Sequence, residues 1–116
     1  MKKTEKTFEN IKHINEFGSE YWFARELYPL LEYASWDKFL NVIKKAMTAC
    51  KNSNNNIEDH FFQVGKMVKT GDSYREIVDY HLSRYACYLL VQNADPNKEI
   101  IALGQTYFAL QTRKQN

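Results

Sequence analysis

The chain has 116 residues, 44% of them hydrophobic and 26% charged, which is enough for one domain with a modest core. The formal net charge is only +2, so composition excludes a strongly basic tail and leaves any nucleic-acid site as a local patch. No apolar run approaches the roughly 18 residues that cross a bilayer, and no apolar stretch follows the basic amino terminus. We therefore expect a cytoplasmic protein that does not associate with a membrane.

The first quarter of the chain predicts a flexible start and then a β-hairpin. Residues 1–7 are polar and suggest no element. Residues 8–15 alternate between apolar and polar side chains, and the aromatic segment 20–24 suits a second strand. Gly18 tolerates a positive φ, so the turn is expected at 16–19.

Two helices are expected next. Residues 25–33 form the first, in which Pro29 is tolerable near the first turn. Ser35 is a good N-cap for the second, which runs from Trp36 to about Lys51. Its apolar side chains recur at the spacing of a buried helical face. They are Trp36, Phe39, Leu40, Ile43, Met47 and Cys50.

The asparagine-rich segment 52–56 ends this helix, and 57–62 is expected to be a helical turn or a short link. Residues 63–80 then predict a second hairpin that turns at Gly71 and Asp72. Its apolar side chains are expected to pack on the body of the domain. They are Val64, Met67, Val68, Ile77 and Val78.

Two further helices are expected at 84–93 and from Pro96 to about Arg113. Asp95 is a candidate cap for the second, with Pro96 at its first position. Gly104 lies on the apolar face of that helix, which suggests that another helix approaches closely.

The stretch 79–90 holds residue types found in active sites, but it favours a helix start. Ser83 directly precedes the periodic run and suits an N-cap, whereas a nucleophilic serine needs a base and an oxyanion site. His81 is expected to point elsewhere. Arg84 opposes the helix dipole, so it either pairs with a carboxylate or binds a phosphate.

Metal and redox chemistry find little support. The three histidines are isolated, without the spacing of a metal site. Cys50 and Cys87 fall within helical patterns and lack a CxxC spacing, so we expect two core thiols in a reducing compartment. A disulfide between them is the alternative. We expect no enzyme, no cofactor and no metal.

Two features suggest DNA binding. The helices at 25–33 and 36–51 are joined by about three residues, which is the outline of a helix-turn-helix. Basic side chains on the second helix and around the second hairpin could contact phosphates. With Arg84, the candidate set is Lys38, Lys44, Lys45, Lys51, Lys66, Lys69 and Arg75. The simpler interpretation of these charges is a solvated surface.

Several long blocks resemble the bacterial DNA-damage-inducible protein D family. They are "YWFARELYPLLEYASWDKFLNVIKKAMTACKNS", "EDHF" and "DYHLSRYACYLLVQNADPNKEIIALGQTYFALQTRKQ". More loosely, the order of elements is similar to the Bro-N domain of phage antirepressors and baculovirus repeated-ORF proteins. The resemblance implies a DNA-associated regulatory domain tied to the response to DNA damage, and it supplies no catalytic residues.

We therefore predict an α+β fold in which two small hairpins pack with four or five helices, in a single domain over residues 8–116. The predicted function is a Bro-N-like regulatory domain that contacts DNA. The alternative is a protein-interaction module that modulates a repair or repressor protein without touching DNA.

Overall fold

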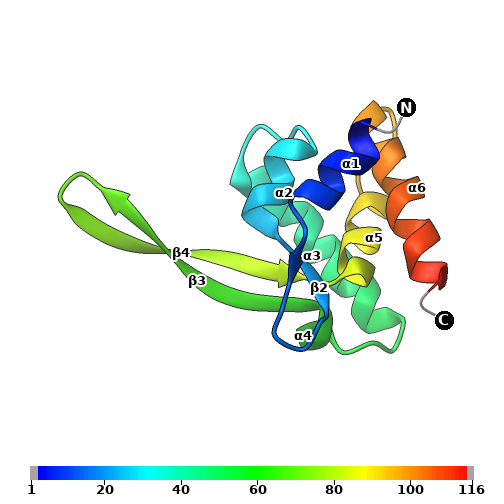
Figure 1. Cartoon of the computed structure of the whole chain (residues 1–116), viewed down its shortest axis with the longest axis horizontal. Helices are drawn as coiled ribbons and strands as arrows, with labels where there is room; N and C mark the ends of the chain where they lie inside the picture. Colours follow the sequence, from blue (N-terminus) through cyan, green and yellow to red (C-terminus); the bar gives the residue numbers. More distant parts are fainter. Residues whose placement is uncertain (1–2, 115–116) are drawn as a thin grey trace.

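The computed structural model describes the backbone of residues 3–114 and the side chains of residues 7–109. This part of the chain contains six helices and a four-stranded sheet, so the α+β class is confirmed, with one helix more than expected (Figure 1). The elements are α1 (Lys3–Asn10), β1 (His13–Ile14), β2 (Glu20–Phe23), α2 (Ala24–Leu30), α3 (Trp36–Asn52), α4 (Ile57–His60), β3 (Phe61–Thr70), β4 (Ser73–Leu82), α5 (Arg84–Gln92) and α6 (Glu99–Lys114).

The two predicted hairpins exist, but they belong to one antiparallel sheet in the order β1-β2-β4-β3. Pairing of β2 with β4 joins them, with Trp22 opposite Leu82 and Phe23 opposite His81. Because opposed residues share a face, Trp22, Leu82 and Phe61 point to the same side, where all three are buried.

The second hairpin is neither small nor packed along its length. Its strands have ten residues each, and residues 64–78, here called the arm, project from the body along the longest axis of the molecule (Figure 1). Gly71 turns the chain at φ +63°, as predicted. The expected packing is wrong for Met67 and Val78, which are 61% and 40% exposed because no helix covers the arm.

Helix α1 was not predicted. The strand was expected to begin at residue 8, but residues 8–10 belong to this helix. Phe8 is fully buried, stacked on Tyr107 and edge-on to Phe108 of α6. Its carbonyl also accepts from the indole N–H of Trp22 at 2.9 Å. The two ring contacts join residues about 100 positions apart in the chain, so local alternation could not reveal them.

Helices α5 and α6 also contribute buried side chains to the core. A Cβ on Gly104 would lie 3.2 Å from both Phe8 and Val91, which confirms the close approach inferred from sequence. Cys50 and Cys87 are buried free thiols, as expected, and burial raises the pKa of each. Within residues 3–114, no helix has the length and apolar character needed to cross a membrane.

The two serines cap helices as the sequence predicts, whereas the two prolines do not occupy their predicted helix positions. Pro29 lies in the last turn of α2, not the first. Helix α6 begins at Glu99, because Asp95 accepts from the backbone N–H of Asn97 at 3.0 Å and holds Pro96 in a preceding turn.

Candidate nucleic-acid interface

Helix α3 carries four of the candidate basic residues, and all four are exposed. Ser35 caps the helix as predicted, accepting from the N–H of Lys38 at 3.2 Å. The exposed lysines are Lys38, Lys44, Lys45 and Lys51. None forms an ion pair among the described residues.

The buried stripe of α3 differs from the predicted one. Phe39, Ile43, Ala46 and Cys50 are buried, whereas Trp36, Leu40 and Met47 are only half-buried. The stripe therefore lies about 40° around the helix from the predicted position, at 100° per residue. The two lysine pairs consequently lie on opposite flanks, each about 120° from the stripe, with Lys44 and Lys51 on the flank of Met47.

Met47 connects this flank to the base of the arm. It lines one hollow together with Gln63 of β3 and Tyr80 of β4. Residues three and four apart are neighbours on a helix surface, so Lys44 and Lys51 lie directly beside Met47. The same proximity does not hold for Lys38 and Lys45, which occupy the other flank.

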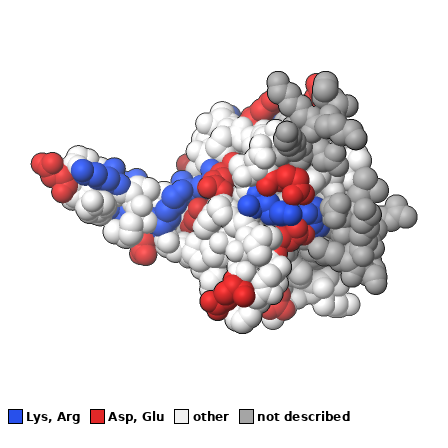
Figure 2. Space-filling model, in the orientation of Figure 1, with Lys and Arg blue, Asp and Glu red and all other residues white. Residues whose placement is uncertain are grey.

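The arm carries three more candidates, all exposed. The register places Arg75 opposite Val68 and Lys66 opposite Ile77, so Lys66 and Arg75 share one face of the ribbon. Lys69, opposite Tyr74, lies on the other face. Basic and acidic groups alternate along the arm in Figure 2, where Asp72 and Glu76 supply the acidic ones.

The base of the β3–β4 hairpin meets α2 through a buried carboxylate. Phe23, the N-cap residue of α2, provides no side-chain cap. Asp79 of β4 takes this role instead, accepting from the backbone N–H of Arg25 at 3.0 Å and of Tyr80 at 2.8 Å. Helices α2 and α3 are joined by residues 31–35, and Arg25 lies 4.1 Å over the ring of Trp36.

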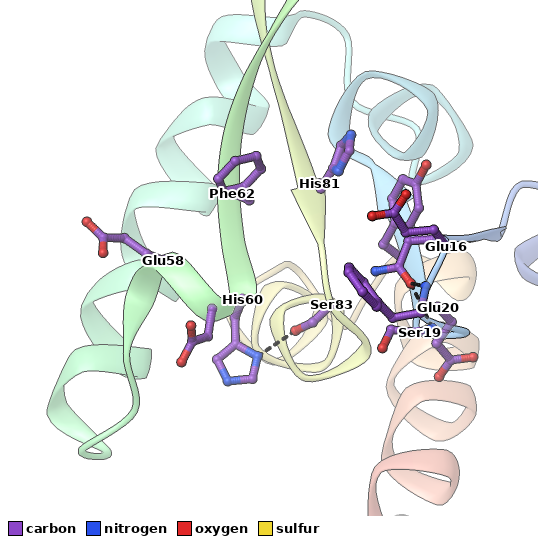
Figure 3. Close-up of a pocket in the computed structure, with 12 residues that line it drawn as sticks. Glu16, Ser19, Glu20, Glu58, His60, Phe62, His81 and Ser83 are labelled. Atoms are coloured by element: carbon purple, nitrogen blue, oxygen red, sulfur yellow. Dashed lines mark hydrogen bonds between the residues drawn. The ribbon is translucent and has the colours of Figure 1, made fainter.

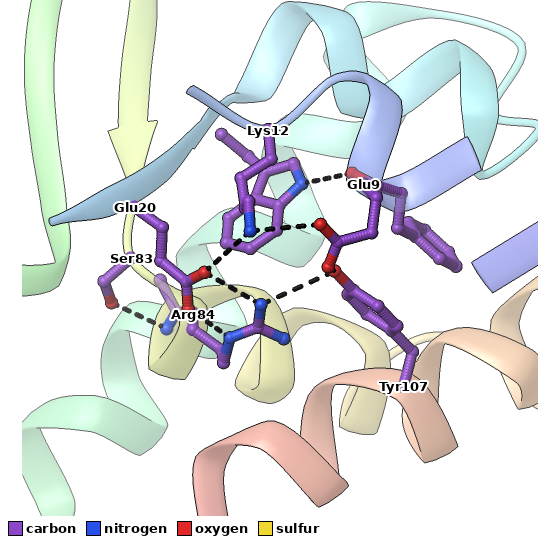
Figure 4. A network of polar contacts seen from close by, with 9 residues as sticks. Glu9, Lys12, Glu20, Ser83, Arg84 and Tyr107 are labelled. Carbon is purple, nitrogen blue, oxygen red and sulfur yellow. Dashed lines mark hydrogen bonds and ion pairs between the residues drawn. The ribbon is translucent and has the colours of Figure 1, made fainter. Parts of the chain in front are cut away.

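Arg84 lies apart from the other candidates. It is 3% exposed and donates through Nε and Nη2 to Glu20, with 2.9 Å between Nη2 and Oε1 (Figure 4). The carboxylate alternative from the sequence is therefore what the structure contains. Since its guanidinium faces Glu20 and the ring of Tyr107 rather than solvent, the proposed interface omits Arg84.

The pair belongs to a larger polar network. The Tyr107 hydroxyl donates to Glu9, and Lys12 Nζ lies 3.0 Å from Glu9 and 3.4 Å from Glu20 (Figure 4). The hydrogen bond from Arg84 lowers the pKa of Glu20, and the one from Tyr107 lowers the pKa of Glu9. Burial raises the pKa of Tyr107. The network therefore joins residues of α1, β2, α5 and α6.

Ser83 is an N-cap, as predicted: its hydroxyl oxygen accepts from the N–H of Ala86 at 3.0 Å. His81 points elsewhere, but sequence reasoning missed His60, whose Nδ1 lies 2.7 Å from the Ser83 oxygen. Burial lowers the pKa of His60. No sequence spacing indicates this contact, because it depends on the β3–β4 pairing that places residue 60 beside residue 83.

Comparisons with known proteins match nearly the whole chain. The model of the BRO family N-terminal domain, Bro-N, matches residues 10–109. The chain is 51% identical over 116 residues to DNA damage-inducible protein D of Escherichia coli (strain K12). That alignment covers 99% of this chain but only 42% of the relative, so the chain spans less than half of its length. No solved structure gives a significant match.

Proposed function

The chain belongs to the Bro-N family, the BRO family N-terminal domain, and we propose that it is a cytoplasmic regulatory domain of the DNA-damage response that binds DNA. The name of its relative, DNA damage-inducible protein D, supports the link to damage. The observation that carries the DNA contact is the position of Lys44 and Lys51 beside Met47, at the base of the arm.

The proposed contact set is the flank of α3 together with the arm. Lys44 and Lys51 are two turns apart, which spans about 10 Å along the helix at 1.5 Å per residue. That length can reach more than one phosphate of a duplex. The arm adds the exposed cations Lys66, Lys69 and Arg75. Phosphate contacts of this kind position a protein on the duplex without reading its sequence.

The net charge of +2 limits the affinity that this surface can supply. If all five cations contact phosphates, log K should fall against log salt with a slope of about −4.5 for B-form DNA. Binding should then be of the weak, sequence-independent kind, with a Kd of roughly 10⁻⁴ to 10⁻⁶ M at physiological salt.

The test is salt-titrated binding to a generic duplex, measured by fluorescence anisotropy. Lys44→Glu with Lys51→Glu should flatten the slope by about 1.8, because two phosphate contacts are lost. Lys38→Glu with Lys45→Glu makes the same charge change on the opposite flank and should leave the slope near the wild-type value. No binding of the wild type at low salt, or equal effects of the two variants, would contradict the proposal.

A further inference from the structure

A second surface with the opposite charge lies on the open face of the sheet. The register places His13, Tyr21, Phe23, His81 and Phe62 on one face, the reverse of the face that packs on the core. Their rings are in contact: Tyr21 stacks on His81 with 4.3 Å between centroids, and Phe23 lies edge-on to His81 at 4.8 Å. Phe62 is 58% exposed.

A groove of about 980 Å³ runs over this aromatic face. Its floor includes Tyr21, Phe62 and His81, with the His60–Ser83 pair at one end (Figure 3). The loop between β1 and β2 forms one wall and includes Phe17, which is 83% exposed. Helix α4 forms the other wall. The aromatic rings lie between the two walls and line the open groove.

The groove is acidic. Among the residues that the structure describes, its lining includes Glu16, Glu20, Glu58 and Asp59 but no lysine or arginine. Glu20 is paired with Arg84, whereas the other three form no ion pair within the described residues. In Figure 3, Glu16 and Glu58 lie on opposite sides of the groove. Burial lowers the pKa of His60 and of His81, so these rings are neutral near pH 7 and leave the negative charge uncompensated.

The charge selects the kind of occupant. Exposed rings on a four-stranded sheet are a general way to stack the bases of single-stranded nucleic acid, but such sites combine the rings with a basic groove that follows the phosphates. Here Glu16, Glu58 and Asp59 would repel the phosphates. An arginine satisfies both features, because its planar guanidinium stacks on aromatic rings and donates paired hydrogen bonds to a carboxylate.

The chain contains the same combination internally. Arg84 lies 5.0 Å from the ring centroids of Trp22 and of Tyr107 while pairing with Glu20. We propose that the groove between the β1–β2 loop and α4 binds an arginine side chain of a partner protein, with Tyr21, His81 and Phe62 as the stacking surface and Glu58 and Asp59 as the counter-charge. This site lies on the aromatic face of the sheet rather than on the lysine flank of α3, and it borders the hollow beside Met47, which Glu58, Asp59 and Phe62 also line. It would recruit a basic protein segment.

The experiment measures binding of fluorescein-labelled short peptides by anisotropy at low salt. One peptide alternates arginine with glycine, and its match alternates lysine with glycine. The wild type should bind the arginine peptide about tenfold more tightly, because lysine cannot stack as a plane. Phe62→Ala, and Glu58→Gln with Asp59→Asn, should each weaken arginine-peptide binding by about tenfold.

The matched control is Asp72→Asn with Glu76→Gln, which removes the same charge from the arm. It should change peptide binding by less than about twofold, since these residues do not line the groove. Equal affinity for the two peptides, or equal loss in the groove and arm variants, would overturn the proposal. Binding of an oligothymidylate that Phe62→Ala abolishes would also overturn it and assign the rings to nucleobases.

Two controls keep the result interpretable. Phe62 is exposed, so its truncation should leave the melting temperature nearly unchanged; if it does not, Phe62→Leu removes the aromatic ring while keeping apolar bulk, and the same tenfold loss is required. Lys44→Glu with Lys51→Glu should bind the arginine peptide at least as well as the wild type. Retention of peptide binding in that variant separates this site from the DNA proposal, whichever way the DNA test turns out.

Discussion

The base of the β3–β4 hairpin and the arm follow one continuous register, yet they differ in their surroundings. At the base, Phe61 and Leu82 are buried in the core, and Asp79 is bonded to the start of α2. Along the arm, Met67 is 61% and Tyr74 is 66% exposed. A two-stranded ribbon without further packing is marginal in water. We infer that the base fixes the fold, whereas the arm adds little to the core and is free to serve the proposed DNA contact.

If the packed end determines stability, the largest loss should come from the buried ion pair. Glu20→Ala leaves the 3% exposed Arg84 without its carboxylate, which should cost about 3 kcal/mol of the free energy of unfolding. Denaturant titration measures the loss, and Glu20→Gln, which keeps one acceptor, should lose less. A cost under about 1 kcal/mol would show that this network does not secure the core.

The same network predicts a pH dependence. The folded-state pKa values of Glu9 and Glu20 lie below their unfolded value of 4.5. Their stabilisation is therefore fully present above pH 4.5 and is lost as pH falls through the folded values. Thermal melts across this window should show the decline, and Glu20→Gln should flatten it. A profile identical to the wild type would rule out the contribution of Glu20.

Asp79 tests the junction between base and arm. Asp79→Ala removes the acceptor of the Arg25 and Tyr80 amides at a buried position, which should cost about 2 kcal/mol. Asp79→Asn retains an oxygen acceptor and should cost less. Chemical denaturation of the two variants provides the comparison, and equal losses would exclude the capping role.

A smaller effect is expected at the start of α5. Ser83→Ala removes the cap on Ala86 and the contact with His60, and should cost roughly 0.5–2 kcal/mol. Ser83→Asp should retain most of the stability, because aspartate caps as well. If both substitutions destabilise equally in denaturant melts, the hydroxyl is not acting as a cap.

The smallest effect is expected on the arm. Met67→Ser with Tyr74→Ser changes two exposed side chains that do not contact the core. The free energy of unfolding should change by less than about 0.5 kcal/mol per substitution. Differential scanning calorimetry can detect a larger shift, which would show that the arm is part of the cooperative fold.

Sequence predicted the features that depend on neighbouring residues. Ser35 and Ser83 cap helices, and Gly71 turns a hairpin, because caps and turns require particular side chains at fixed local offsets. The α3 helix was predicted, but its buried stripe lies about 40° from the predicted one, because Ala46 belongs to it and Trp36 lies at the edge of the core.

The features that sequence missed depend on distant contacts. Helix α1 is fixed by Phe8 against α6, and Ser83 meets His60 at the end of α4. The aromatic face was missed although Tyr21 and Phe23 alternate at the strand period, because only the register places His81 and Phe62 beside them. The alternation of apolar and polar residues likewise indicated the second hairpin. It could not indicate whether a helix would pack on that hairpin.

The most direct test shortens the arm and measures folding and DNA binding together. Residues 66–77 are replaced by Asn-Gly, a two-residue turn that suits the paired positions Gly65 and Val78. We predict an unchanged cooperative melt and a log K against log salt slope flattened by about 2.7, because Lys66, Lys69 and Arg75 are gone. DNA binding equal to the wild type, or loss of the cooperative melt, would contradict the division between a base that folds and an arm that binds.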